Sequence, residues 1–310
     1  MRYRFKMSMF LLVLGLTILL AAGCGNSADD GQAGDDSLKV VTSYSIIYDL
    51  VIQVAGDRAE VTSLVPLGQD PHQYEPTPAD IRAVAESDIV FFNGFNLELW
   101  FDRLVANAGG ERPVVEVSGG IEPRLIEVGG YTGYPDPHAW MDVALTIKYV
   151  ENIRDAMIDN DPEGRGDYEA NAAAYVVELK QLDEWIREET ARIPAGNRKL
   201  VTTEDAFQYF ARAYEYKIVG FLYYIAADEE PSPRFLAQLI DRIRDEQVPA
   251  VFLETTLDPR LLQQIANEAD VEIGAQVYVD SLGEPGSGVD TYIGMMRHNV
   301  EAFVTHLGGE

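Results

Sequence analysis

Short apolar runs alternate with segments of helical periodicity along most of the chain. In the first half, the runs that predict strands fall at 38–45, 61–66, 89–93 and 114–117, and the predicted helices at 46–55, 77–86 and 97–107. The second half has predicted strands at 199–203, 217–222, 250–254 and 273–279 and predicted helices at 233–247, 259–268 and 289–307. This alternation is typical of βαβ units, so each half is predicted to contain a mainly parallel sheet flanked by helices.

A single amphipathic stripe marks the segment between the two halves, residues 167–193. Its apolar side chains recur at helical spacing, at Tyr168, Ala172, Tyr175, Leu179, Leu182, Ile186 and Ile193. A helix of these 27 residues would be about 40 Å long. The predicted fold is therefore α/β with two lobes, 38–166 and 194–310. One long rigid helix joins the lobes, packs its stripe into the core and restricts hinge motion.

The N-terminus has the pattern of an export signal. Arg2, Arg4 and Lys6 precede an apolar run at residues 9–22 that is too short to span a bilayer comfortably. Small residues then lead to Cys24, the only cysteine of the chain. This junction resembles a bacterial lipobox, although Ala21 stands where leucine is usual. Residues 1–23 are thus predicted to be a signal peptide and Cys24 a lipidation site, with an ordinary secretory signal and an incidental cysteine as the alternative.

The composition after the signal is acidic. Residues 24–37 contain no large apolar side chain, which predicts a disordered tether between the membrane and the folded part. The whole chain has 24 Lys and Arg against 51 Asp and Glu, a net charge of −27, and no basic patch, so nucleic acid is excluded as a partner. An acidic surface also suits a saline or alkaline habitat, so charge alone is weak support for a metal function.

Two of the four histidines lie in the same tripeptide, Asp-Pro-His, at residues 70–72 and 136–138. The proline fixes φ and pushes the preceding aspartate toward extended geometry, so each imidazole projects from a stiffened loop. Imidazole is the commonest transition-metal ligand, and His72 and His138 therefore predict half of a metal site. Asp70 and Asp136 are interpreted as carboxylates that accept a hydrogen bond from an imidazole N–H and fix its tautomer, with direct metal coordination as the alternative.

Two carboxylates end predicted strands of the second half. Ligands of open α/β sheets bind beyond the carboxyl ends of the strands, and Glu204 ends KLVTTE while Asp280 ends EIGAQVYVD. Two imidazoles and these two carboxylates would close around one ion between the lobes. Glu204 has the alternative of capping the next helix, for which Asp205 is the better candidate. His298 and His306 are interpreted as ordinary residues on the face of a helix.

Five motifs in register resemble one protein family. GQDPHQYEPTPAD, NGFNLELW, DPHAWMD, VTTEDAFQYF and VYVDSLGEPG are similar to segments of the manganese/zinc/iron solute-binding proteins of ABC transporters, lipoproteins of the pneumococcal surface adhesin A type. The resemblance implies a monomeric, two-lobed receptor that holds one divalent metal at His72, His138, Glu204 and Asp280. It also implies a lipid anchor on the outer face of the bacterial cytoplasmic membrane, or a periplasmic location, and delivery to a permease driven by a separate ATPase.

The third ligand position separates the metals within this family. Zinc-type members usually carry histidine there and a histidine-rich loop after the first motif, whereas this chain has Glu204 and no such loop. Carboxylate oxygen suits Mn²⁺. The resemblance therefore implies Mn²⁺ as the cargo, with Fe²⁺ and Zn²⁺ as alternatives and a zinc-specific receptor as the competing interpretation.

Two other classes of function are alternatives to a receptor. A mononuclear metallohydrolase needs an open coordination position and a nearby base that is not a ligand. Here all four candidate residues are used as ligands and no HExxH motif occurs, so an enzyme is not favoured. A surface adhesin is a label that some family members carry, but the sequence shows no adhesive module.

Lipidation of Cys24 predicts how the protein fractionates. The wild type should partition into membranes or detergent, and a Cys24→Ser variant should be released or remain unprocessed. Two or three acyl groups are expected, because a single chain binds membranes only marginally. Cell fractionation and immunoblotting measure the distribution, and a Cys24→Ser protein that fractionates like the wild type would contradict the lipid anchor.

Overall fold

The computed structural model describes residues 37–127, 131–224 and 231–308, and Cys24 with its predicted signal and tether lies outside them. The first half contains a four-stranded parallel sheet of order β2-β1-β3-β4. Its strands are β1 (Leu38–Thr42), β2 (Ala59–Ser63), β3 (Ile89–Phe92) and β4 (Val114–Glu116). Residues 40–42 of β1 and 89–91 of β3, the central strands, are buried, as expected for apolar runs in a parallel sheet covered by helices.

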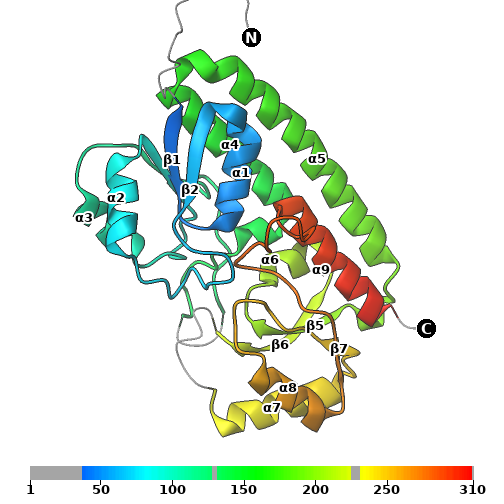
Figure 1. The fold of residues 1–310 in the computed structure, drawn as a ribbon. Helices are drawn as coiled ribbons and strands as arrows, with labels where there is room; N and C mark the ends of the chain where they lie inside the picture. The colour runs from blue at the N-terminus through cyan, green and yellow to red at the C-terminus, as the bar shows by residue number, and fades with distance from the viewer. Residues whose placement is uncertain (1–36, 128–130, 225–230, 309–310) are drawn as a thin grey trace, which may run out of the picture. The chain divides into compact units, whose positions relative to one another are not determined.

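Four α-helices accompany this sheet: α1 (Ser45–Ala55), α2 (Pro78–Glu86), α3 (Phe101–Ala108) and α4 (Val143–Asn160). Helix α1 packs against α4, whereas α2 packs against α3 beside β1 (Figure 1). Helix α4 was not predicted from the sequence, although Asp142 caps it by accepting a hydrogen bond from Ala144 N. Its buried Val150, Ile153 and Met157 also recur at helical spacing.

The second half contains two short parallel pairs. These are β5 (Lys199–Glu204) with β6 (Lys217–Tyr223), and β7 (Ala250–Val251) with β8 (Glu272–Ile273). A parallel bridge between Thr202 and Phe252 connects the two pairs. Strands predicted at 250–254 and 273–279 are shortened to two residues each, because pairing beyond them continues only as isolated bridges.

Helices cover this part as well: α6 (Gln208–Tyr214), α7 (Pro233–Asp245), α8 (Arg260–Ala269) and α9 (Tyr292–Leu307). Helices α7 and α8 pack together next to β6 (Figure 1). Short 3₁₀ turns occur at Gly56–Arg58, Ala139–Met141, Pro162–Gly164 and Ala195–Asn197. The predicted mixed α/β class, with parallel sheets flanked by helices, is confirmed.

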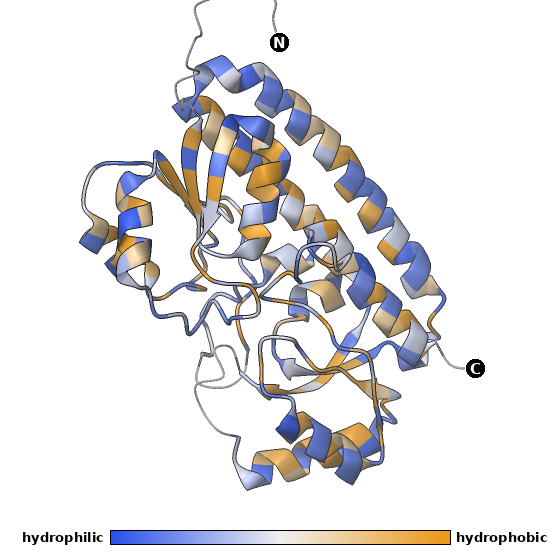
Figure 2. Ribbon diagram, in the orientation of Figure 1, coloured by the Kyte–Doolittle hydropathy of each residue, from blue (hydrophilic) through white to orange (hydrophobic). Residues whose placement is uncertain are grey.

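The long connecting helix is confirmed as α5 (Arg165–Ala191), which begins and ends two residues before the predicted segment. It packs against α1, α4 and α9. The predicted stripe is the buried face, at Tyr168, Ala172, Tyr175, Leu179, Leu182 and Ile186. In Figure 2 much of α1 has the hydrophobic colour, whereas along α5 orange alternates with blue. The stripe is therefore core packing on one face of a solvated helix.

The hydrophobic core does not separate into one cluster per half. The main cluster runs from Val40 of β1 to Leu307 of α9, and a smaller one joins β5, β6 and β7 to α7 and α8. Residues Ser37–Glu310 accordingly form one compact unit. Among the described residues, no helix is both long and apolar enough to cross a membrane.

Candidate metal centre

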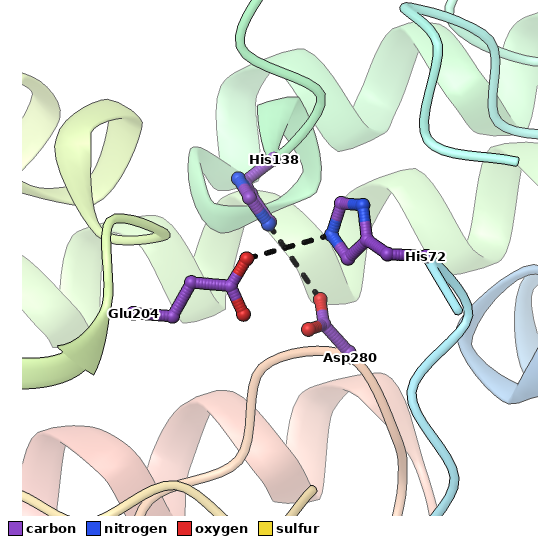
Figure 3. Close-up of side chains that lie close together, drawn as sticks. All are labelled: His72, His138, Glu204 and Asp280. Atoms are coloured by element: carbon purple, nitrogen blue, oxygen red, sulfur yellow. Dashed lines mark ion pairs between the residues drawn. The ribbon is translucent and has the colours of Figure 1, made fainter. Parts of the chain in front are cut away.

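Four side chains from distant parts of the sequence converge in the interior. His72 follows β2, His138 precedes the turn that leads into α4, Glu204 is the last residue of β5, and Asp280 lies between β8 and α9. Each residue offers one possible ligand atom, and these atoms all lie within 4.8 Å of one another (Figure 3). The structure thus brings together all four residues that the sequence singled out.

The spacing of these atoms fits an ion between them. Nε2 of His72 lies 3.7 Å from Oε1 of Glu204, and Nε2 of His138 lies 3.7 Å from Oδ1 of Asp280 (Figure 3). These separations are too long for hydrogen bonds. Two ligands that each lie about 2.0–2.2 Å from a shared cation are separated by about 3.5 Å in tetrahedral geometry. The four groups are therefore placed for coordination rather than for direct pairing.

Buried atoms without hydrogen bonds support the same interpretation. Nε2 of His72, Nε2 of His138 and both carboxylate oxygens of Asp280 are buried and have no hydrogen-bond partner among the described residues. An unsatisfied buried polar group costs about 1–3 kcal/mol, and native proteins keep few of them. A divalent cation would satisfy all of these atoms at once.

Burial also shifts the titration of these groups. It lowers the pKa of His72 well below its usual range, an effect increased by His138, and it raises the pKa of Asp280 to about 7. Burial opposes a charge on His138 as well, but its hydrogen bond to Asp136 outweighs this and raises its pKa. A cation would replace the proton that burial otherwise favours on Asp280.

Both Asp-Pro-His tripeptides form the same local turn. Oδ1 of Asp70 accepts a hydrogen bond from His72 N at 2.7 Å, and Oδ1 of Asp136 accepts one from His138 N at 3.1 Å. An aspartate that bonds the backbone two residues later forms an Asx turn. Proline at the intervening position stiffens this turn, which explains why the same tripeptide presents both imidazoles.

The two aspartates differ in their contact with the ring. Oδ1 of Asp136 lies 2.9 Å from Nδ1 of His138, which leaves Nε2 to face the cluster. Nη1 of Arg124 lies 3.6 Å from the other Asp136 oxygen. The hydrogen bond identified for Asp70 goes to the His72 backbone instead of the ring.

The motif NGFNLELW donates a hydrogen bond to the backbone of each Asp-Pro-His tripeptide. Nδ2 of Asn93 donates to the Pro137 carbonyl at 3.0 Å, and Nε1 of Trp100 donates to the Pro71 carbonyl at 2.7 Å. Glu98 fixes this motif, because its Oε1 accepts hydrogen bonds from Asn93 N and from Ser43 Oγ. In the sequence this motif supports only the family resemblance, because its structural role depends on contacts that the sequence does not show.

Other candidates fall outside the cluster. His298 Nε2 bonds the Gln276 carbonyl, and His306 Nδ1 lies 2.7 Å from Oε1 of Glu272. The prediction that Asp205 caps the next helix is wrong. Two residues separate Asp205 from α6, whose N-cap position is Phe207, and the Asp205 side chain accepts from Gln208 Nε2 instead.

The chain matches a known protein family over residues 40–306, the family described as zinc-uptake complex component A, periplasmic (ZnuA). The chain belongs to this family.

Two curated relatives cover almost all of the chain. The manganese-binding lipoprotein MntA of Halalkalibacterium halodurans is 42% identical over 299 residues, which is 96% of this chain and 98% of the relative. The manganese ABC transporter substrate-binding lipoprotein PsaA of Streptococcus pneumoniae is 36% identical over 303 residues, 96% of each chain. The family includes extracytoplasmic substrate-binding lipoproteins of ABC transporters.

Solved structures of related proteins share the fold. The periplasmic zinc-binding protein TroA of Treponema pallidum is 28% identical with a TM-score of 0.82, over 87% of this chain and 99% of that one. A Mn-bound periplasmic metal-binding protein of Candidatus Liberibacter asiaticus is 29% identical with a TM-score of 0.77, over 86% and 98%.

Glu98 predicts a pH dependence of stability. Burial raises its pKa from 4.5 to about 7 in the folded protein, so the folded state binds more protons and loses stability as pH rises from about 5 to 8. Glu98→Gln keeps an acceptor oxygen and removes this loss. The difference in free energy of unfolding between Glu98→Gln and the wild type should therefore shift in favour of the variant as pH rises. From pH 5 to pH 8 we expect this shift to be on the order of 2 kcal/mol.

Urea unfolding of metal-free protein at both pH values measures this difference. Glu127→Gln is the control, because it removes the same charge from a side chain that is 80% exposed. A difference between Glu98→Gln and wild type that does not change with pH would contradict the prediction.

Proposed function

We propose that this protein is the extracytoplasmic receptor of an ABC importer, which captures a divalent metal ion and delivers it to a membrane permease. The observation that carries the proposal is the convergence of two imidazoles and two carboxylates in a buried cluster, with their ligand atoms within 4.8 Å of one another. Membership of a family of metal receptors supports it. A receptor needs no catalytic base, and all four residues serve as ligands.

The proposed ligands are His72 and His138 through Nε2, together with the carboxylates of Glu204 and Asp280. Asp136 orients His138 by accepting a hydrogen bond at Nδ1, and Asp70 shapes the turn that presents His72. Such supporting groups typically change metal affinity by about 10–100-fold.

The proposed cargo is Mn²⁺, with Fe²⁺ and Zn²⁺ as alternatives. Two carboxylates in a set of four make a harder site than three imidazoles and one carboxylate, and hard oxygen ligands suit Mn²⁺. The names of the relatives MntA and PsaA, both described as manganese proteins, support this choice over a zinc-specific receptor. Because TroA is described as a zinc-binding protein, the fold itself accepts either metal.

The proposed arrangement at the membrane extends the sequence analysis. The mature protein would begin at the lipidated Cys24, continue through the tether 24–37, and act as a monomer. Lobes 38–166 and 194–310 hold the ion between them, and the linking helix 167–193 limits their movement. Since the main core runs through both halves, we infer that release requires docking on the permease and the work of its separate ATPase.

Single ligand replacements should weaken binding. We expect His72→Ala, His138→Ala, Glu204→Ala and Asp280→Ala each to reduce Mn²⁺ affinity at least tenfold, about 1.4 kcal/mol, because each removes one ligand. The matched controls are His298→Ala and His306→Ala, which remove imidazoles outside the cluster and should bind like the wild type. Full affinity of the Glu204 or Asp280 variant in calorimetry would contradict the proposed site.

The metal that the isolated protein binds most tightly should not be the proposed cargo, Mn²⁺. Divalent ions generally bind nitrogen and oxygen sites more tightly in the order from Mn²⁺ toward Cu²⁺, with Zn²⁺ above Mn²⁺. We therefore expect Zn²⁺ to bind the isolated protein at least as tightly as Mn²⁺ and to stabilise it more against heat. Glu204→His should widen the preference for zinc, because imidazole is the softer ligand. Competition titrations measure both, and a wild type that prefers Mn²⁺ outright would refute this account.

A further inference from the structure

A third carboxylate, Glu254, lies three residues beyond the end of β7 in the second half. Beyond β7 the chain continues in extended form, where Glu254 forms an isolated parallel bridge with Val277. On its other side lies the end of β5, which carries Glu204. Glu254 thus lies between the two segments that supply the carboxylate ligands of the second half, and its residue is 1% exposed.

Hydrogen bonds connect Glu254 to both neighbouring segments. Its Oε1 accepts a hydrogen bond from Glu204 N at 2.8 Å, and its own N–H donates to Thr203 Oγ1 at 3.2 Å. On the other side, Gln276 Nε2 donates to the Glu254 carbonyl at 3.4 Å. Where the end of β5 meets the segment that follows β7, side-chain oxygens of Glu254 and Thr203 therefore accept the hydrogen bonds that backbone carbonyls accept in a regular sheet. The orientation of Glu204 depends on the Glu254 side chain rather than on strand pairing alone.

The position is unfavourable for a carboxylate that has no function. The Oε2 atom of Glu254 is buried and has no hydrogen-bond partner among the residues that the structure describes. Folded proteins avoid such atoms, and an individual exception calls for an explanation. Groups that orient metal ligands through hydrogen bonds provide one, because displaced ligands lose affinity.

We propose that Glu254 is a positioning residue of the metal site, which holds the backbone N–H of Glu204 and thereby directs the Glu204 carboxylate toward His72. This inference rests on the metal-receptor function proposed above. Glu254 is not one of the four grouped ligands. Its contribution is the hydrogen bond that fixes one of them.

Two substitutions separate this hydrogen bond from simple packing. Glu254→Gln keeps an amide oxygen that can accept from Glu204 N, whereas Glu254→Met has similar length and no such acceptor. Mn²⁺ affinity is measured by calorimetry, and the geometry of the bound ion by electron paramagnetic resonance. We expect Glu254→Met to bind Mn²⁺ at least tenfold more weakly with an altered spectrum, and Glu254→Gln to stay within about threefold of wild type with an unaltered spectrum.

Asp49 provides a matched control. It is a buried carboxylate of α1, and its Oδ2 accepts a hydrogen bond from Tyr292 N at 2.8 Å, at the start of α9. Asp49→Asn and Asp49→Leu repeat the same pair of changes at a carboxylate that bonds no ligand. Asp49→Leu should lower the melting temperature of the metal-free protein but leave the Mn²⁺ affinity and spectrum unchanged.

The outcomes are distinguishable. Wild-type affinity in Glu254→Met, or a loss in Glu254→Gln as large as in Glu254→Met, would overturn the positioning role. If Glu254→Met does not fold, Glu254→Asp tests the same contact, because its shorter side chain withdraws the acceptor. That variant should bind at least threefold more weakly, and full affinity would overturn the inference. A wild type that binds no divalent cation would instead refute the proposed function, and this inference with it.

Discussion

Two imidazoles and two carboxylates are buried together in this protein with their ligand atoms within 4.8 Å of one another, and the rest of the structure depends on that arrangement. Burial of unsatisfied polar atoms opposes folding. His72, His138 and Asp280 nevertheless keep buried atoms that no hydrogen bond satisfies within the described part of the chain. The surrounding fold must supply enough stability to hold these groups in place until a cation satisfies them.

The groups are held by rigid local turns and by contacts between distant segments. Each Asp-Pro-His turn is closed by its own aspartate and supported by a donor from NGFNLELW. In addition, Nε1 of Trp140, two residues after His138, donates to the Val279 carbonyl next to Asp280 at 3.1 Å. The segments that carry ligands therefore support one another directly. A ligand set built in this way is preorganised, so little ordering remains when the ion binds.

The same rigidity constrains how a proposed receptor releases its cargo. Helix α5 packs against elements of both halves, and the main core extends from β1 to α9. A continuous core resists the wide hinge motion that separate lobes allow. Small displacements of one ligand-bearing segment would be enough to break coordination, because metal bonds depend steeply on distance.

The sequence by itself determined the features that depend on neighbouring residues. Periodicity predicted the parallel α/β halves and the long helix, proline and aspartate predicted the two histidine turns, and strand ends directed attention to Glu204 and Asp280. Local patterns were less informative elsewhere: α4 was missed although its buried residues recur at helical spacing, and the cap assigned to Asp205 was wrong. Glu254 likewise ends the predicted strand 250–254, but it was not predicted as a site residue, because nothing in the sequence distinguishes it from an ordinary strand terminus. Only the tertiary structure decided which distant groups meet: Glu98 with Ser43, Trp100 with Pro71, and Glu254 with the backbone of Glu204. These pairings depend on strand register and packing across 29 to 55 residues of sequence, which no local pattern encodes.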